Sequence, residues 1–295
     1  MEDFTDIVIL GHIAKDIIEV DGISNESLGG AVYYGGIACS RMNLKVFIIT
    51  HLKKDDFPIL DIFKQNNITF LAYPSEETSG LRNIYSSKNL EFRQYNPLGF
   101  AGKFRKEEIP TINTKYFVIG GILAGEFDIE LLDDIHKKYT NKVCLDIQGF
   151  IRVLENNTVS YKNLPKEEKE YMFSLIKVLK VDQTEAFVLT KEKDIVKALK
   201  KLNRLGPEEI LITHEKGITL NAFNEIYFFP WKNKNSLGRT GRGDTAFLSY
   251  LGSRISKTPI ESLKFATALT SLKLEIPGPF SQPMSNVFNL IEKEY

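Results

Sequence analysis

The chain has 295 residues, 43% of them hydrophobic and 26% charged, so it carries enough apolar material for a large buried core. Its 38 basic residues balance 38 acidic residues, which argues against broad attraction to nucleic acid or an anionic membrane. The acidic start and the lack of any apolar run of about 18 residues predict neither a signal peptide nor a membrane span. Two cysteines are too few for a disulfide framework, and we expect a cytoplasmic protein.

Short β-branched runs alternate with helical stretches along much of the chain. The runs typical of strands buried on both faces are 6–10, 45–50, 116–120, 143–146 and 209–213. Between two of these runs, residues 129–139 place apolar side chains on one helical face and charged side chains on the other. This alternation predicts an α/β fold with a mostly parallel sheet covered on both sides.

Two regions break the alternation and are predicted as hairpins outside the sheet. Residues 16–28 form a strand, a turn at Asp21-Gly22 and a return, and residues 78–100 alternate around a polar tip. These segments predict a small β-lid on one domain that spans residues 1–295. Toward the C-terminus, Thr258 to Glu261 forms a capping box that starts a helix, with Pro259 at its first position.

A glycine-rich loop, Gly238 to Thr245, runs directly into another predicted helix. Its glycines let backbone N–H groups converge, and the helix N-terminus adds partial positive charge, so the loop suits a phosphate. Asp244 lies where a carboxylate could accept a proton from a hydroxyl that attacks a phosphoryl group. On spacing alone, an aspartate that merely caps the helix after a glycine turn remains an alternative.

The loop resembles the C-terminal motif of the ribokinase-like (PfkB) carbohydrate kinases, D-T-x-G-A-G-D. Arg239 stands near the usual Asp position and Arg242 replaces the usual Ala. Further segments match in family order, and these are 11–16, 28–31, 181–185 and 212–217. The resemblance implies a ribokinase-like three-layer α/β/α sandwich and transfer of the γ-phosphoryl group of ATP to an alcohol group.

The resemblance also implies roles for the matched residues. Asp244 would be the general base, and the backbone of Gly241, Arg242 and Gly243 would hold the transferring phosphoryl group. The implied nucleotide contacts are Asp182, Thr213, Lys216, Gly217 and Thr240, and the implied Mg²⁺ contacts are Asp182 and Glu185. Asp182 departs from the family's usual Asn. The resemblance leaves room for a monovalent cation and for a homodimer formed through the lid.

The segment from Asp146 to Arg152 follows a predicted strand, at the end where open α/β sheets bind ligands. With the N-terminal motifs it resembles the archaeal myo-inositol kinase branch, which makes myo-inositol the expected acceptor. The implied polyol-binding residues are Asp16, Gly29, Gly30, Gln148 and Arg152. A turn held by a surface ion pair is the alternative for Gln148 and Arg152.

Two arginines on the predicted lid are compatible with other classes of phosphoryl acceptor. If Arg82 and Arg93 faced the pocket, they would favour a sugar acid over a neutral polyol, because guanidinium groups pair with carboxylates. A nucleoside kinase and a non-catalytic, ligand-sensing member of the family are the remaining alternatives.

Overall fold

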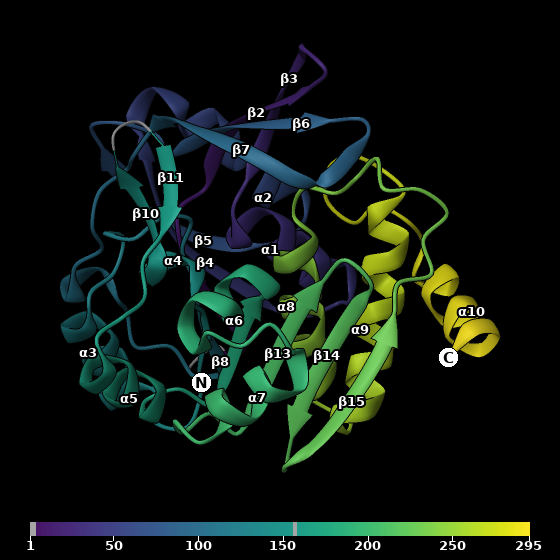
Figure 1. Ribbon diagram of the computed structural model, residues 1–295. Coiled ribbons are helices and arrows are strands. Elements are labelled where there is room, and N and C mark those ends of the chain that lie inside the picture. The colour runs from purple at the N-terminus through teal and green to yellow at the C-terminus, as the bar shows by residue number, and fades with distance from the viewer. Residues whose placement is uncertain (1–3, 156–157) are drawn as a thin grey trace.

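The computed structural model describes residues 4–155 and 158–295, with the backbone alone at 89–93. Within these residues, a nine-stranded sheet runs in the order β15-β14-β13-β12-β9-β8-β1-β4-β5 (Figure 1). Its strands are β1 (Thr5–Leu10), β4 (Val46–Lys53), β5 (Thr69–Ser75), β8 (Thr114–Gly120), β9 (Val143–Asp146), β12 (Val178–Asp182), β13 (Glu209–His214), β14 (Gly217–Ala222) and β15 (Glu225–Pro230). The pairs from β12–β13 through β4–β5 are parallel, whereas β13–β14 and β14–β15 are antiparallel. The predicted mostly parallel sheet is confirmed.

Helices cover both faces of this sheet. One face carries α1 (Ala31–Arg41), α2 (Asp61–Gln65), α8 (Arg242–Arg254) and α9 (Pro259–Leu274), and the other carries α3 (Ile129–Lys138), α5 (Lys166–Ser174), α6 (Gln183–Thr190) and α7 (Ile195–Asn203). The remaining helical segments are η1 (Lys54–Leu60), η2 (Lys106–Glu108), α4 (Gln148–Ile151) and α10 (Met284–Glu294). None of the described helices is both long and apolar enough to cross a membrane.

Strand β1 shows why both faces of the sheet are buried. Ile7 and Ile9 pack into the apolar cluster under α1 and α8, while Val8 and Leu10 pack into the cluster under α3 and α6. Because side chains alternate along a strand, an uninterrupted apolar run supplies both clusters. The predicted three-layer α/β/α sandwich is therefore confirmed.

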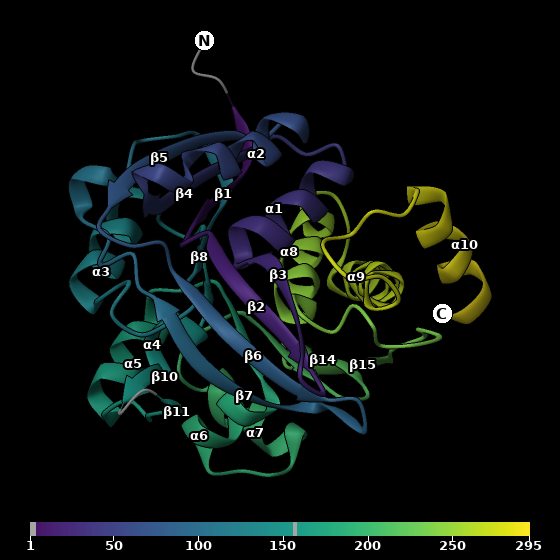
Figure 2. The ribbon, with the colours of Figure 1, turned by 90° about the horizontal axis from the view of Figure 1, so that it is seen from above.

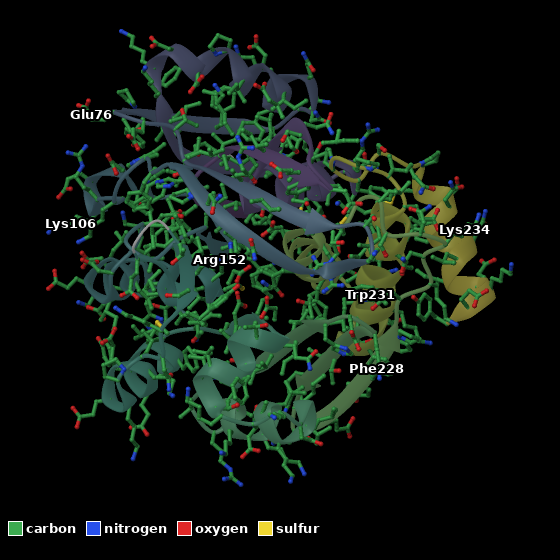
Figure 3. All side chains as sticks on the ribbon, turned by 45° about the horizontal axis from the view of Figure 1, so that its top comes forward. Glu76, Lys106, Arg152, Phe228, Trp231 and Lys234 are labelled. Atoms are coloured by element: carbon green, nitrogen blue, oxygen red, sulfur yellow. The ribbon has the colours of Figure 1, made fainter. Side chains whose placement is uncertain are left out.

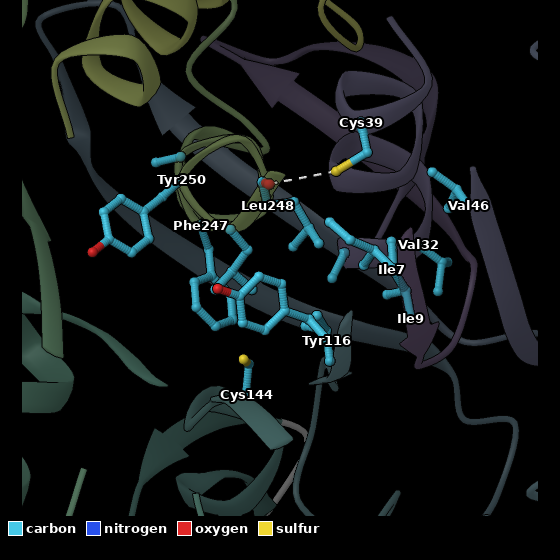
Figure 4. Packing of buried hydrophobic residues seen from close by; sticks show 14 of the residues in the cluster. Ile7, Ile9, Val32, Cys39, Val46, Tyr116, Cys144, Phe247, Leu248 and Tyr250 are labelled. Carbon is cyan, nitrogen blue, oxygen red and sulfur yellow. Dashed lines mark hydrogen bonds between the residues drawn. The ribbon is translucent and has the colours of Figure 1, made fainter. Parts of the chain in front are cut away.

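Helix α8 is fixed closely against α1 and the sheet. Gly35 of α1 makes room for it, because a Cβ there would lie 2.4 Å from Cγ of Leu248. The buried thiol of Cys39 donates to the Leu248 carbonyl at 3.4 Å (Figure 4). At the other end of α8, Arg254 pairs with the buried Glu209 of β13 at 2.8 Å. These contacts set the position of the helix N-terminus.

A second, four-stranded sheet lies across one end of the sandwich in the order β3-β2-β6-β7 (Figure 2). Its strands are β2 (Ala14–Val20), β3 (Ile23–Gly29), β6 (Gly80–Ser86) and β7 (Asn89–Gly99). The two segments expected to form hairpins pair as β2–β3 and β6–β7, and the parallel β2–β6 pairing joins them. We call this sheet the lid.

A further hairpin beside the lid was not predicted. Strands β10 (Arg152–Glu155) and β11 (Thr158–Tyr161) pair antiparallel, and β11 packs against β7 (Figure 1). Its first residue, Arg152, was expected in a ligand-binding turn.

Candidate active site

A small pocket of about 80 Å³ lies beneath the lid, and we call it the lid pocket. The lid strands, the loops at the carboxyl ends of the body strands and the glycine-rich loop before α8 all contribute to its wall. Its lining residues are Asp16, Gly30, Tyr34, Leu81, Asn83, Ile122, Gln148, Arg152, Lys180, Asp182, Thr213, Arg239, Thr240, Gly241, Arg242, Gly243 and Asp244. A larger hollow of about 560 Å³, the outer pocket, adjoins it and shares Asp182, Thr213, Arg239 and Arg242. The two pockets therefore meet at the glycine-rich loop.

The glycine-rich loop turns sharply into α8. Gly241 occupies the helix cap with a φ of 81°, and a Cβ there would lie 2.3 Å from the Tyr34 ring. Asp244 lies in the first turn of α8, one turn beyond the cap position, which removes simple capping as its explanation. The N–H of Arg242 donates to the Arg239 carbonyl at 3.3 Å, so this N–H already has a hydrogen-bond acceptor within the turn. The first N–H groups of a helix otherwise lack intrahelical partners, which leaves Gly241 and Gly243 as the better phosphoryl-binding positions.

A buried lysine that sequence reasoning missed lies beneath Gly243. The Lys180 ammonium lies 2.9 Å from Oδ2 of Asp146 and 3.8 Å from Oε2 of Glu185. Burial alone would lower the pKa of Lys180, but the Asp146 and Glu185 carboxylates outweigh it and raise the pKa. A Cβ added at Gly243 would lie 3.1 Å from Nζ of Lys180. A fixed positive charge thus lies under the start of α8.

The expected Mg²⁺ residues form the start of α6. Oδ1 of Asp182 accepts the Glu185 N–H at 2.8 Å, and Oε2 of Glu185 accepts the Asp182 N–H at 2.6 Å. Burial and the charge of Asp182 raise the pKa of Glu185, whose Oε1 is buried without a hydrogen-bond partner among the described residues. No group of three or more acidic, His or Cys side chains in the described residues could hold a metal. Mg²⁺ usually keeps several waters and binds one or two carboxylates together with substrate phosphates. Asp182 lines both pockets and fits that role, whereas Glu185 is fully buried and lines neither pocket.

Asp16 and the adjacent glycines form the lid side of the pocket. Oδ1 of Asp16 accepts the Leu81 N–H at 2.8 Å. A Cβ at Gly29 would lie 2.3 Å from Oδ2 of Asp16, so Gly29 makes room for that carboxylate and does not itself line the pocket. Gly30 does line it, and its φ of 90° begins α1.

Gln148 and Arg152 form the opposite wall. Nε2 of Gln148 donates to the Gly121 carbonyl at 3.1 Å, and its Oε1 accepts from the Arg152 guanidinium. Arg152 is 3% exposed and lies 5.0 Å from the centre of the Tyr95 ring on β7 (Figure 3, below the lid strands). A surface ion pair therefore does not describe these residues, because the guanidinium is buried between the hairpin and the lid.

Of the remaining residues predicted for the site, some line the pockets and others lie outside them. Lys216 is exposed in the β13–β14 turn, and neither Lys216 nor Gly217 lines either pocket. Among the implied nucleotide contacts, Asp182, Thr213 and Thr240 do line the lid pocket. On the lid, Arg82 pairs with Glu19 at 2.9 Å and does not line the pocket. The side chain of Arg93 lies outside the described residues.

The inward face of β6 supplies residues that the sequence analysis did not single out. Leu81, Asn83 and Tyr85 alternate with Arg82, and all three are buried. The Tyr85 hydroxyl lies 3.0 Å from Oγ1 of Thr240, which connects the lid to the glycine-rich loop. The strand alternation of this segment was the available signal for their direction.

No protein-family model and no curated protein matches the chain. Solved structures match along most of it. A pyrophosphate-dependent kinase in the ribokinase family, solved as a sulfate complex, is 29% identical over 93% of this chain and 97% of its own, with a TM-score of 0.87. A solved structure of a pyrophosphate-dependent kinase in the ribokinase family, complexed with a pyrophosphate analogue and myo-inositol, is 27% identical over 96% of this chain and 99% of its own, with a TM-score of 0.86.

A pyrophosphate-dependent myo-inositol-1 kinase, which substitution converts into a myo-inositol-3 kinase, is 26% identical over 98% of this chain and 100% of its own, with a TM-score of 0.88. Along nearly its whole length, the chain is similar to kinases of the ribokinase family. The predicted resemblance to this family and the predicted kinase class are confirmed.

A buried carboxyl group holds the loop beside the lid pocket of this kinase. Oε1 of Glu126 accepts the N–H groups of Ile122 at 2.5 Å and Leu123 at 2.8 Å. Glu126 is fully buried, and burial raises its pKa to about 7 in spite of these hydrogen bonds. Ile122 lines the pocket, so the carboxyl group of Glu126 supports one wall of the site.

Glu126→Gln should become more stable relative to the wild type as pH rises. The folded-state pKa of about 7 exceeds the unfolded value, so the folded wild type binds more protons between the two values. Its stability contribution is present at low pH and is lost as pH rises through about 7, whereas glutamine does not titrate. Thermal unfolding near pH 5 and near pH 8 measures the difference in Tm, with Glu130→Gln on α3 as the exposed control. A Tm difference that is the same at both pH values contradicts the assignment.

Proposed function

We propose that this kinase transfers a phosphoryl group from pyrophosphate to a hydroxyl of myo-inositol. The observation that carries the proposal is the pair of arginines, Arg239 and Arg242, that lies where the lid pocket meets the outer pocket. Both stand in the glycine-rich loop, and the candidate base Asp244 lines the same pocket. An anionic donor in the outer pocket and a neutral acceptor in the lid pocket would meet at this loop.

The lid pocket supports a neutral polyol as acceptor. Asp16, Asn83 and Gln148 offer carboxylate and amide groups, which pair with hydroxyls as donors and acceptors. Arg82, which would have favoured a sugar acid, is paired with Glu19 and does not line the pocket. The solved structure of a similar kinase with myo-inositol bound points to the same class of acceptor.

The loop supports pyrophosphate as donor. Arg242 is 5% exposed, and its guanidinium lies 5.7 Å from the centre of the Trp231 ring. Arginine binds phosphate oxygens through two parallel hydrogen bonds. Pyrophosphate has no adenosine group to bury, so its affinity depends on such charges. The similar kinases are pyrophosphate-dependent, and Lys216 lies outside both pockets.

ATP, the donor that the sequence motifs imply, is the second candidate. The outer pocket has a volume of about 560 Å³ and extends past the arginines to Phe187 and Lys193. That space exceeds what a pyrophosphate alone requires. The same loop and the same base would serve either donor.

Asp244 would accept the proton of the attacking hydroxyl while the N-terminus of α8 stabilises the negative charge on the transferring group. Asp182 would hold Mg²⁺, which neutralises charge on the donor phosphates, and Glu185 would fix the start of α6 that carries Asp182. The lid, closed onto the loop through Tyr85 and Thr240, would exclude water and limit hydrolysis of the donor. The presence of Asp244 in the pocket argues against a non-catalytic, ligand-sensing member of the family.

The donor and acceptor are tested by steady-state assays with Mg²⁺ and myo-inositol, using pyrophosphate and ATP in parallel. We expect kcat/KM for pyrophosphate to exceed that for ATP by at least about 30-fold, or about 2 kcal/mol of transition-state binding. A larger kcat/KM for ATP would reject the donor assignment. Transfer to a sugar acid or a nucleoside, but not to myo-inositol, would reject the acceptor assignment.

Asp244→Asn should lower kcat by at least about 10²-fold, because the amide keeps the shape of the side chain but cannot accept the proton. The donor KM should stay within about threefold of the wild type. The matched control is Asp194→Asn, since Asp194 caps α7 with its side chain. A variant that retains more than about a tenth of wild-type turnover contradicts the role of Asp244 as base.

Arg242→Ala should raise the KM for pyrophosphate by about tenfold or more and leave the KM for myo-inositol within about threefold, since the buried guanidinium binds the donor. Arg204→Ala, at the exposed end of α7, is the control. An unchanged donor KM would remove Arg242 from the donor site, and a rise confined to the acceptor KM would move it to the acceptor.

A further inference from the structure

A second buried lysine lies behind the glycine-rich loop. Lys273, in the last turn of α9, is 1% exposed. Its ammonium donates to the backbone carbonyls of Gly238 and Thr240 and lies 4.9 Å from the centre of the Tyr34 ring. One side chain from α9 therefore binds two carbonyls of the loop that leads into α8.

The backbone of α9 holds the same segment. The Gly238 N–H donates to the Leu274 carbonyl at 2.7 Å, and a Cβ at Gly238 would lie 2.5 Å from the Lys273 carbonyl oxygen. The start of the loop is thus pressed against the end of α9, where a glycine is required. The C-terminal end of a helix carries partial negative charge, which favours an ammonium at this place.

Burying a charged ammonium group at this position costs free energy, because the group loses its hydration. Burial, together with the charges of Arg239 and Arg242, lowers the pKa of Lys273 to about 7, while the carboxylate of Asp244 acts in the opposite direction. A buried charge is retained where it is hydrogen-bonded and where removing it costs more than keeping it. The two loop carbonyls supply the hydrogen bonds.

The direction of the Thr240 carbonyl determines the direction of the next N–H. In a trans peptide the C=O and the following N–H point to opposite sides. Because the Thr240 carbonyl points to Lys273, the Gly241 N–H points away from Lys273. Gly241 lines the lid pocket and Lys273 does not, so the N–H is turned toward the pocket side of the loop. The positive φ of Gly241 then lets the chain enter α8.

We propose that Lys273 is a positioning residue for phosphoryl transfer: its ammonium holds the Gly238 and Thr240 carbonyls so that the Gly241 N–H stays directed at the transferring group. Its ammonium already supplies a positive charge to these two loop carbonyls. This kinase therefore needs no added monovalent cation. The inference rests on the phosphoryl-binding role of the loop in the proposed function.

The test combines Lys273→Ala, which leaves space for a small cation, with Lys273→Met, whose apolar chain fills that space. Lys264→Met, on the same helix and outside both pockets, is the matched control. Turnover is measured in tetramethylammonium chloride and in ammonium or potassium chloride at equal ionic strength. Binding of imidodiphosphate, a pyrophosphate analogue, is measured by calorimetry in the same buffers.

We expect wild-type turnover to vary by less than about threefold among the three salts. Lys273→Ala should lose at least about 30-fold in kcat and regain at least about fivefold with ammonium or potassium, while Lys273→Met should lose as much and regain nothing. A purely structural role would lower Tm without a salt-specific recovery. Wild-type dependence on ammonium or potassium, or a Lys273→Ala variant without loss or without recovery, would overturn the proposal.

If both variants fail to fold, the dependence of wild-type turnover on the salt still tests the proposal. Failure of the proposed function gives a different result, because it removes wild-type turnover with pyrophosphate and myo-inositol. Imidodiphosphate binding then decides for Lys273. Binding that weakens in Lys273→Ala and recovers with ammonium supports the positioning role, and binding that is equal in both proteins rejects it.

Discussion

The site depends on the fixed position of one helix end, the N-terminus of α8. Partial positive charge at a helix terminus falls off within a turn, so a displacement of the helix would remove it from the transferring group. Gly35 lets α8 lie directly on α1, and Glu209 of β13 pairs with Arg254 at the opposite end. The core contacts that stabilise the sandwich therefore also fix the position and direction of α8.

Buried lysines surround that helix end from two sides. Lys180 lies beneath Gly243 and is neutralised by Asp146 and Glu185, whereas Lys273 lies behind Thr240 and is bound by carbonyls. The first is a stable ion cluster in which the pKa is raised, and the second is a strained charge in which the pKa is lowered. A site that binds an anionic donor gains from positive charges that are already in place before the donor arrives.

The parts of the fold that could be predicted are those determined by local pattern. Strand β1 is an apolar run because both faces are buried, and the helix after Thr258 begins with a capping box that the structure contains. Strand β15 was missed because it lies at the sheet edge, where exposed and half-buried residues replace the apolar run.

The chemistry of the glycine-rich loop could be predicted from its sequence motif. The residues that support the loop could not be predicted in this way. Lys180 stands in an otherwise apolar strand, and Asp146 becomes its neighbour through the parallel register of β9 and β12. Lys273 resembles any helix lysine until α9 is placed against the loop. The outward direction of Arg82 depended on which face of β6 the pocket occupies. Each of these features depends on how distant segments of the chain are placed in the fold. The spacing of residues in the sequence does not give that placement.

The parallel pairing of β2 with β6 has a consequence for how the molecule folds. It joins Ile17 to Arg82, so this pairing closes a long loop that contains β3, β4 and β5. Long-range pairings are slow to form because the loop entropy is lost before the contacts are made. The lid would therefore form late and open as a separate unit, with faster amide exchange than the strands beneath it. Catalytic competence and global folding would then be lost in two distinct steps on heating.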